Sequence, residues 1–340
     1  MLYDVLILGR GIAGAALAEI CRQRGLSAHV FDLKQDGNAS LAAAGVVNPV
    51  VLRRDVLSWR AEELMPLVET FYKGWQKRMG IQCWHPAPLV KIFPTAHEAA
   101  QWERAMAAAA TSRFIDRRPE PEIDMGPVRA THGYGTVTAS AWLNVPLLLS
   151  AQRDNLIWNG QLTEKRVNDN DIRRTPESVH IGEVQGRWLV HCTGPFAEMS
   201  GLIPVKGETL TVRIRGLHLA RMVHRGIFLL PLGGHIYRIG ATFKWDGVWD
   251  GSTEEARTWL MERLTALVDA PIEVLDQQWG VRPTTKDRRP ILGMLTAQEA
   301  VLNGLGSHGV MLAPWCAGHL LDHLFERKAL VPEVDRARFD

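Results

Sequence analysis

Three glycines near the N-terminus have the spacing that a bound nucleotide requires. Gly9, Gly11 and Gly14 form the pattern Gly-x-Gly-x-x-Gly. In such a pattern the first glycine permits a tight turn, the second lets the backbone approach a pyrophosphate, and the third lets a helix pack closely on a strand. A helix that begins here directs its unpaired N–H groups at the phosphates. Taken alone, the pattern would also suit an ordinary glycine turn.

The elements around these glycines favour the nucleotide. Residues 4–8 are a short apolar run, as expected of a strand buried on both faces, and residues 15–24 have a helical composition. A second apolar run, 28–31, ends in Asp32, which is placed to accept hydrogen bonds from an adenosine ribose. Strand, glycine turn, helix, strand and acid predict a dinucleotide site of the Rossmann type. This unit does not discriminate FAD from NAD.

Three further segments favour a flavin. Residues 39–49 are dense in alanine, so their backbone could lie against a flat ring, and Gly45 could take positive φ there; an alanine-rich helix start is the alternative. The apolar run 187–192 ends in Thr-Gly. Residues 304–311 are glycine-rich and open a helix that runs to about Phe325. The positive end of that helix would stabilise negative charge at the N1–C2=O edge of a reduced flavin.

This order of motifs is similar to that of the D-amino-acid oxidase superfamily of FAD-dependent enzymes. Residues 202–321 especially resemble bacterial glycine oxidase, with matching elements at 204–208, 240–242, 280–287 and 312–314. The chain also resembles the oxidase domain of the bifunctional enzyme that modifies the wobble uridine of tRNA. The resemblance implies an α/β fold in which a Rossmann-like FAD-binding domain of the glutathione-reductase type is interleaved with a mixed-sheet substrate domain.

The resemblance also implies a discontinuous domain arrangement. The FAD-binding domain would comprise residues 1–48, 136–203 and 276–335, and the substrate domain residues 49–135 and 204–275. Independently of the resemblance, residues 60–78, 96–110 and 253–268 read as helices, the last capped by Ser252 or Thr253. Residues 227–230 and 236–239 read as a hairpin around Gly233 and Gly234.

The cofactor residues that this reading implies lie in every one of these motifs. They are Gly9, Gly11, Ile12, Ala13, Gly14, Asp32, Leu33, Ser40, Ala44, Gly45, Val167, Thr193, Gly194, Gly306, Ser307, His308, Gly309, Val310 and Met311. The related sarcosine oxidases attach the flavin through a cysteine near the position of Arg282. None of residues 282–287 is a cysteine, so we expect non-covalent FAD.

The implied reaction is oxidation of the C–N bond of a small carboxylated amine, an amino acid or an N-substituted glycine, by hydride transfer to flavin N5. In such a reaction the protein mainly positions the substrate and supplies the electrostatic environment. In the resembling enzymes the arginine at the position of Arg282 clamps the substrate carboxylate, a task that suits a guanidinium because it forms two parallel charged hydrogen bonds. Alternatively, Arg282 is structural and pairs with Asp287 or a helix end.

Two departures from glycine oxidase make glycine itself doubtful as a substrate. Phe228 stands where that enzyme has its active-site tyrosine, and Ser307, followed by His308, stands where it has a second arginine. The predicted catalytic set is Arg282, His308, Phe228 and Lys244. Arg53, Arg54 and Trp279 are further possible partners of the substrate, although each could equally be a surface or packing residue. We expect Lys206 to organise the hairpin that leads into the substrate domain.

Composition restricts the remaining possibilities. With 340 residues the chain can form two joined domains, and its formal charge of +2 argues against nucleic-acid binding as the main role. No apolar segment is long enough for a membrane span, no secretory signal is evident, and the four cysteines lie far apart, so we expect a cytoplasmic protein with reduced thiols. His319 and His323 are spaced to share a metal but have no third ligand in view, so we expect none.

Two other functions stay open. A tRNA-modifying oxidoreductase acting on a carboxymethylaminomethyl uridine would use the same Arg282, and a basic face formed by Arg113, Arg117, Arg118 and Arg129 would support it. A flavin-binding regulatory protein without turnover is suggested by Phe228 and Ser307. The electron acceptor, oxygen or a quinone, and the oligomeric state are not determined by the sequence.

Overall fold

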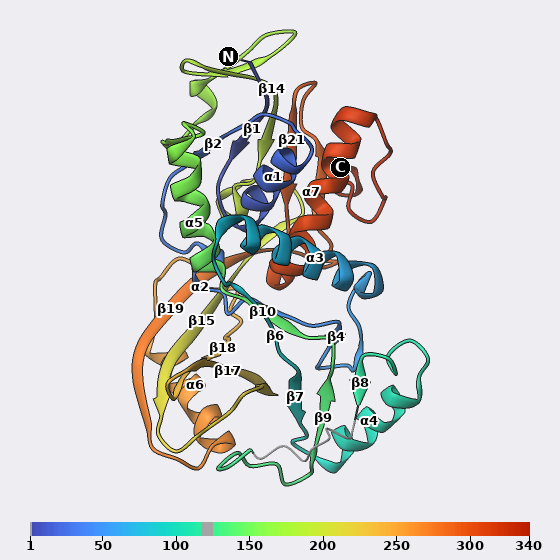
Figure 1. The fold of residues 1–340 in the computed structure, drawn as a ribbon, viewed down its shortest axis with the longest axis vertical. Coiled ribbons are helices and arrows are strands. Elements are labelled where there is room, and N and C mark those ends of the chain that lie inside the picture. Colours follow the sequence, from blue (N-terminus) through green and yellow to red (C-terminus); the bar gives the residue numbers. More distant parts are fainter. Residues whose placement is uncertain (1, 117–124) are drawn as a thin grey trace.

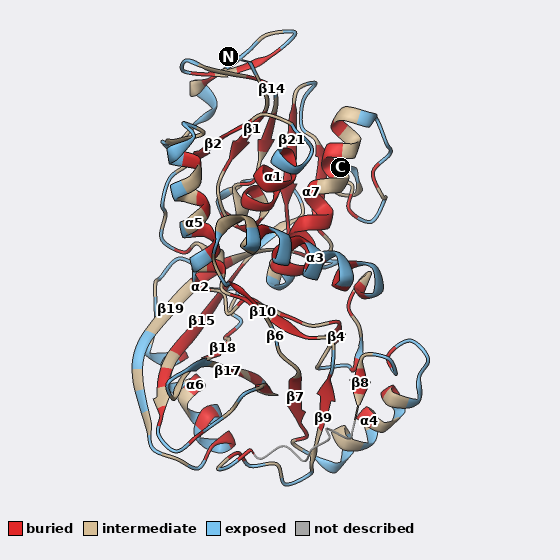
Figure 2. Ribbon diagram, in the orientation of Figure 1, coloured by how far each residue is buried: buried red, intermediate tan, exposed pale blue. Residues whose placement is uncertain are grey.

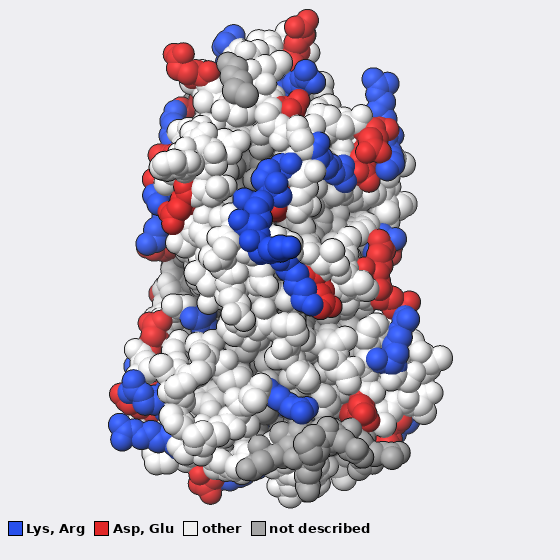
Figure 3. All heavy atoms as spheres, viewed as in Figure 1, with Lys and Arg blue, Asp and Glu red and all other residues white. Residues whose placement is uncertain are grey.

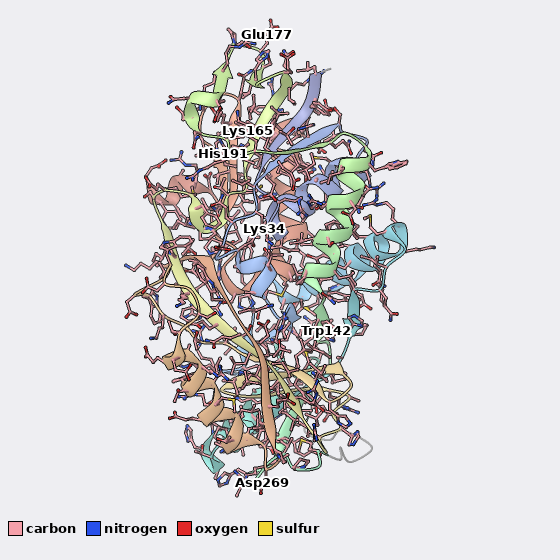
Figure 4. All side chains as sticks on the ribbon, turned by 90° about the vertical axis from the view of Figure 1, so that its left-hand side faces the viewer. Lys34, Trp142, Lys165, Glu177, His191 and Asp269 are labelled. Carbon is pink, nitrogen blue, oxygen red and sulfur yellow. The ribbon has the colours of Figure 1, made fainter. Side chains whose placement is uncertain are left out.

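The structure is a computed structural model that describes residues 2–116 and 125–340. Figure 1 shows an elongated molecule in which two β-sheets follow each other along the long axis, with both chain ends in the upper part. In the side view of Figure 4, Lys165 lies in that upper part and Asp269 at the opposite end. Three segments far apart in sequence build the upper sheet, so the chain passes between the two parts several times.

The first sheet is mostly parallel and carries the predicted nucleotide unit. Its order is β11-β2-β1-β14-β13-β12, with β21 beside β14 and β20 beside β21. Val5, Leu6 and Ile7 of β1 have no exposed surface, as the apolar run predicted for a strand covered on both faces. The strands are β1 (Leu2–Leu8), β2 (Ala28–Asp32), β11 (Leu162–Glu164), β12 (Ile172–Arg174), β13 (Val179–Ile181), β14 (Val184–His191), β20 (Ile291–Met294) and β21 (Glu299–Asn303).

Helices cover this sheet. They are α1 (Ile12–Gln23), α5 (Val145–Trp158) and α7 (Gly309–Glu326), and α3 (Ala61–Met79) packs against α7. The helix predicted over residues 60–78 is α3, and the one predicted from the last glycine-rich turn to about Phe325 is α7. Figure 2 shows the strands of this sheet and most of α7 as buried, which places one continuous apolar core between the parallel strands and the helices.

The second sheet is mixed and forms the lower part of the molecule. Its order is β19-β15-β18-β17-β16-β7-β9-β8, antiparallel except for the parallel pair β16 and β7. The predicted hairpin around Gly233 and Gly234 is the pair β17 and β18. The strands are β7 (Leu89–Ile92), β8 (Ile115–Asp116), β9 (Tyr134–Val137), β15 (Leu202–Ile214), β16 (Met222–Arg225), β17 (Ile227–Gly233), β18 (Ile236–Gly240) and β19 (Ile272–Thr285).

Two helices and several short strands complete this part. The helix α6 (Glu254–Leu267) packs Leu260 and Leu264 against the second sheet, and its first turn is capped by Thr253, whose hydroxyl accepts from the Ala256 N–H. Another predicted helix, over residues 96–110, is α4 (Ala96–Ala107). The remaining elements are α2 (Ala39–Ala42), β3 (Val46–Val47), β4 (Val50–Val51), β5 (Val56–Leu57), β6 (Trp84–Pro86) and β10 (Ala141–Leu143).

The predicted fold class is confirmed, since a Rossmann-like parallel sheet is interleaved with a mixed sheet. The domain boundaries stay a prediction; the one at residue 276 falls inside β19, all of which pairs with β15 in the second sheet. The four cysteines are buried and unpaired. Within residues 2–116 and 125–340, no helix combines the length and the apolar character that crossing a membrane demands.

Candidate active site

A large cleft lies where the two sheets meet. Its volume is about 1510 Å³, and its walls come from the ends of β1, β2 and β14, the start of α1, the segment before α7, and strands β15 to β19 of the second sheet. It also reaches β7 and the start of α4. We call this space the cleft. It exceeds the volume typical of a site for one small ligand, and is large enough for a dinucleotide with a second small molecule beside it.

The glycine turn at the top of the cleft leaves no room for side chains. Gly9 has a φ of +93°, and a Cβ added to it would lie 2.6 Å from the carbonyl oxygen of Cys192. A Cβ on Gly14 would lie 2.0 Å from the carbonyl oxygen of Gly9. The turn thus fits a group that needs close backbone approach, as the phosphates of a dinucleotide do.

Ser40 and Asp32 fix the two sides of this turn. The Ile12 N–H donates to the Ser40 hydroxyl at 3.0 Å, which ties the start of α1 to the segment 39–45. Asp32 accepts from the Arg10 N–H at 2.9 Å, and its carboxylate lies 3.6 Å from the Arg10 guanidinium. Arg10 lines the cleft but was not predicted from the sequence, because the second position of the glycine pattern accepts any residue.

Most of the other predicted cofactor residues also line the cleft. Gly45 takes the expected positive φ of +69°, and a Cβ there would lie 1.9 Å from the carbonyl oxygen of Leu143. Only two predicted residues do not line it: Gly14, which underlies the turn, and Met311, which is buried. Those in the wall are Gly9, Gly11, Ile12, Ala13, Asp32, Leu33, Ser40, Ala44, Gly45, Val167, Thr193, Gly194, Gly306, Ser307, His308, Gly309 and Val310.

The start of α7 also faces the cleft. A short 3-10 turn over Gly306–His308 leads into the helix, so the N-terminal N–H groups of α7 point at the cleft wall. Asn303, at the end of β21, was missed by the sequence reasoning. Its side-chain amide donates to the Gly194 carbonyl at 2.9 Å and so links the end of β14 to this helix start.

The Arg282 side chain projects from β19 and passes over Gly207, which has no side chain to block it. A Cβ on Gly207 would lie 2.1 Å from the Arg282 Nη2. One nitrogen, Nη1, donates to the carbonyls of Lys206 and Thr242, each at 3.2 Å, and the guanidinium lies 5.1 Å from the Phe243 ring centre. Desolvation by burial lowers the pKa of Arg282 to about 10.

No carboxylate of the described residues pairs with Arg282. Asp287, its possible structural partner, binds Arg338 at 2.9 Å instead. The guanidinium is therefore a half-buried cation in the cleft wall, and the hydrogen bonds it makes with the described residues all come from Nη1. A group of this kind binds carboxylates strongly because the alternative is an uncompensated buried charge.

The other predicted catalytic residues are divided between the cleft and the surface. Phe228 and His308 line the cleft. The pKa of His308 is lowered because surrounding protein limits its hydration and because Arg288 is near, so the ring is neutral at neutral pH. Lys244 lies outside the lining and pairs with Glu255, which raises the pKa of the lysine. The structure does not bring Lys244 to the other three.

Of the possible extra substrate partners, only Arg53 lines the cleft. Arg54 lies outside the lining, and Trp279 is in contact range of Gly37. Lys206 is buried and holds Glu208, with its Nζ 3.1 Å from a carboxylate oxygen of that residue, on the strand that enters the second sheet. The organising role expected of Lys206 stays a prediction.

A second polar region at the far end of the cleft was missed by the sequence reasoning. Lys91 of β7 and His224 of β16 face each other across the two strands and both line the cleft. Lys91 is buried and bonded to Asp55 at 2.6 and 2.8 Å. The signal available in the sequence was a lysine inside the apolar run 89–92, since lysine is almost never buried without a partner. His224 offered no such signal.

The two histidines considered as metal ligands have other partners. The Val331 N–H donates to His319 at 3.0 Å, and His323 lies 2.8 Å from the carbonyl oxygen of Lys328. Throughout the described ranges, no group of three His, Cys, Asp or Glu side chains is placed to hold a metal ion.

Comparisons with known proteins agree with this geometry. The family described as FAD dependent oxidoreductase (DAO) matches residues 4–323. Glycine oxidase of Geobacillus kaustophilus is 25% identical over 371 residues, with 96% of this chain and 93% of that protein covered. Its crystal structure superposes with a TM-score of 0.78 over 99% of this chain and 98% of that chain, at 23% identity. Iminodiacetate oxidase of Chelativorans superposes with a TM-score of 0.80 at 18% identity, with 99% of this chain and 98% of that chain covered.

Longer bifunctional proteins also match. The bifunctional protein ThiO/ThiG of Trichormus variabilis is 23% identical over 97% of this chain. The tRNA 5-methylaminomethyl-2-thiouridine biosynthesis bifunctional protein MnmC of Marinobacter nauticus is 22% identical over 96% of it. The chain spans 54% and 56% of the lengths of these two relatives.

Proposed function

Because this chain belongs to the family of FAD-dependent oxidoreductases, we propose that it oxidises the C–N bond of a small amine that carries a carboxylate. The resemblance inferred from the sequence is confirmed, and FAD is the cofactor of the family. The observation that supports the substrate class is Arg282, a guanidinium buried in the cleft wall without a carboxylate partner among the described residues.

In this proposal, different residues bind the cofactor and the substrate. Gly9, Gly11 and the start of α1 hold the pyrophosphate, and Asp32 receives the adenosine ribose. Arg282 binds the substrate carboxylate with the donors that Lys206 and Thr242 leave open. FAD, when bound, supplies the hydride acceptor at its N5. The N-terminus of α7 faces the cleft and favours negative charge there.

The names of two similar proteins are consistent with the proposal. Glycine and iminodiacetate, which appear in the names glycine oxidase and iminodiacetate oxidase, both combine an amine with a carboxylate. We infer the same chemical class for this chain, with Phe228 and Ser307 lining the cleft where glycine oxidase is expected to have a tyrosine and an arginine, and His308 next to Ser307. The electron acceptor, oxygen or a quinone, and the cytoplasmic location remain predictions.

The predicted basic face gives little support to the alternative function as a tRNA-modifying oxidoreductase. Arg113 binds Glu62, Arg129 binds Asp269, and Arg117 and Arg118 lie outside the described residues. A band of lysines and arginines does cross the face that carries α1 and α3 (Figure 3). Two arginines of these helices, Arg22 and Arg78, share Glu19, which reduces their net charge.

Anaerobic reduction of the flavin tests the proposal. The FAD-loaded protein would be mixed with glycine, sarcosine, D-amino acids, iminodiacetate and a carboxymethylaminomethyl nucleoside while the flavin absorbance is followed. Bleaching by a carboxylated amine is expected, and later admission of air would distinguish an oxidase from a dehydrogenase. Failure of every amine, with dithionite still reducing the flavin, would contradict the proposed reaction and favour the regulatory alternative.

A further inference from the structure

A single row of residues crosses the cleft face of the second sheet. Going across the strands, Lys91 pairs with His224, His224 with Phe228, Phe228 with Gly240, and Gly240 with Thr209. Cross-strand partners project from the same face of a sheet, and all five line the cleft. Figure 1 labels β15, β18, β17 and β7 of this row; β16, which carries His224, lies between β17 and β7.

Arg282 ends beside one end of this row. Its guanidinium is bonded to carbonyls of Lys206 on β15 and Thr242 just after β18. The ring of Phe228 occupies the space that Gly240 leaves free, since a Cβ on Gly240 would lie 3.0 Å from that ring. His224 lies on β16, two strands beyond β18, so the usual strand spacing separates these two backbones by about 10 Å. Glycine is too short to contact both ends.

His224 has no partner at its end of the row. Its Nδ1 is buried and makes no hydrogen bond with any described residue. Burial and the charge of Lys91 lower the pKa of His224 to about 4, so the ring is neutral at neutral pH and offers one donor and one acceptor. A buried polar atom without a partner costs free energy that a bound ligand can recover.

Lys91, in contrast, has no free hydrogen-bond donor for a ligand. Its ammonium group has three donors, and these reach the Leu52 carbonyl at 2.7 Å and both carboxylate oxygens of Asp55. Asp55 also offsets most of its charge, although the part that remains contributes to lowering the pKa of His224. The Trp102 ring lies 5.6 Å from the Lys91 Nζ and is fully buried. Nearby Arg53 is exposed to solvent, which screens its charge.

From this row we propose that the substrate is an elongated amine, with its carboxylate on Arg282 and a neutral hydrogen-bonding group, such as an amide or hydroxyl, on His224. The inference rests on the proposed amine oxidation and specifies its substrate. The chain between the two ends lies against Phe228. A second carboxylate is disfavoured because Asp55 has neutralised the only buried cation beside His224 in the described part of this wall.

Three N-substituted glycines with tails of equal length test this assignment. The tails would reach about 10 Å from the carboxylate and end in a carboxamide, a carboxylate or an isopropyl group. Two quantities would be measured on the FAD-loaded protein: kcat/KM for flavin reduction, and the Kd of analogues in which CH2 replaces the amine, followed by the change in flavin absorbance. The carboxamide is expected to be favoured about tenfold in both, the value of one hydrogen bond.

Variants of His224 test whether this side chain causes the carboxamide preference. His224→Leu should remove the carboxamide preference, and His224→Gln should keep part of it. His132→Ala, at an exposed histidine on the loop before β9, should change nothing. A carboxylate or isopropyl tail that binds the wild-type protein as tightly as the carboxamide would overturn the assignment. A carboxamide preference in binding without flavin reduction by any amine would contradict the proposed oxidation and leave the His224 assignment supported.

Discussion

The two ends of the cleft are built from different parts of the chain. At the first sheet, the wall consists of backbone and small residues: a Cβ on Gly9, Gly14 or Gly45 would overlap a carbonyl group. At the second sheet, the wall consists of side chains that reach across strands, such as Arg282 over Gly207 and Phe228 over Gly240. We infer that the first end recognises a cofactor common to the whole family, whereas the second can change its ligand by exchanging single side chains.

This difference suggests that variants of the two ends should fail in different ways. A change in the glycine end should remove the cofactor, and a change in the side-chain end should alter the substrate while FAD stays bound.

The largest effect is expected for Gly14→Val. Its Cβ would lie 2.0 Å from the carbonyl oxygen of Gly9, so the turn must open and the phosphate cradle is lost. The purified variant should contain less than about a tenth of the wild-type FAD, because this contact cannot be relieved by moving a flexible side chain. Flavin absorbance per protein and circular dichroism would be compared with those of Gly74→Ala, where no atom lies within 4 Å of the added Cβ. Normal FAD content in Gly14→Val would contradict the role of the glycine end.

Arg282→Ala should weaken substrate binding and leave FAD bound. Loss of two charged hydrogen bonds should raise KM for a carboxylated amine by about a hundredfold or more. Arg213→Ala provides the control, since Arg213 lies on the neighbouring strand β15 and pairs at the surface with Glu273. Stopped-flow flavin reduction measures both. An unchanged KM in Arg282→Ala would separate Arg282 from the substrate.

Because of His224, the free energy of unfolding of the protein should depend on pH. Its pKa is about 4 in the folded protein against the ordinary histidine value of 6.5, so between these values the unfolded chain binds a proton that the folded chain does not. Stability should therefore fall as the pH falls. From pH 7 to pH 5 the free energy of unfolding should drop by about 2 kcal/mol more in the wild type than in His224→Gln. Urea unfolding measures this difference, and equal losses in both proteins would show that His224 is not held neutral.

The smallest effect is expected for Phe228→Tyr. The new hydroxyl would supply the hydrogen bond that glycine oxidase is expected to give its substrate, so KM for glycine should fall about fivefold, the value of one neutral hydrogen bond. FAD content should stay unchanged. Steady-state kinetics with glycine would measure the change, and an increase in KM would show that the ring only fills space.

The same difference explains what could be predicted from the sequence. Gly9, Gly14 and Gly45 are constrained by local backbone geometry, and the strands and helix that flank the first two are contiguous in sequence, so their roles follow from spacing. The glycine turn, Asp32 and the strands and helix around them were predicted in this way, whereas the interleaved fold class and the rest of the wall at the first sheet were implied by the family resemblance. Arg282 came only from resemblance, because nothing local to residues 280–287 shows that its guanidinium crosses Gly207.

The site residues that could not be predicted from the sequence are positioned by pairing and contacts between segments that lie far apart in the chain. His224 and Lys91 are partners across β16 and β7, which are separated by more than a hundred residues of chain. Lys244 was predicted as a possible replacement for the substrate partners that glycine oxidase has and this chain lacks, but its side chain pairs with Glu255 on α6. Arg10 and Asn303 act through contacts that only the folded chain creates.

One measurement tests the central claim most directly: anaerobic flavin reduction by sarcosine and by N-methylethylamine, which has the same secondary amine but a methyl group in place of the carboxylate. We expect faster reduction by the carboxylated amine, by about a hundredfold at equal concentration, and loss of this ratio in Arg282→Ala. Equal rates with the two amines in the wild-type protein would contradict carboxylate recognition by Arg282.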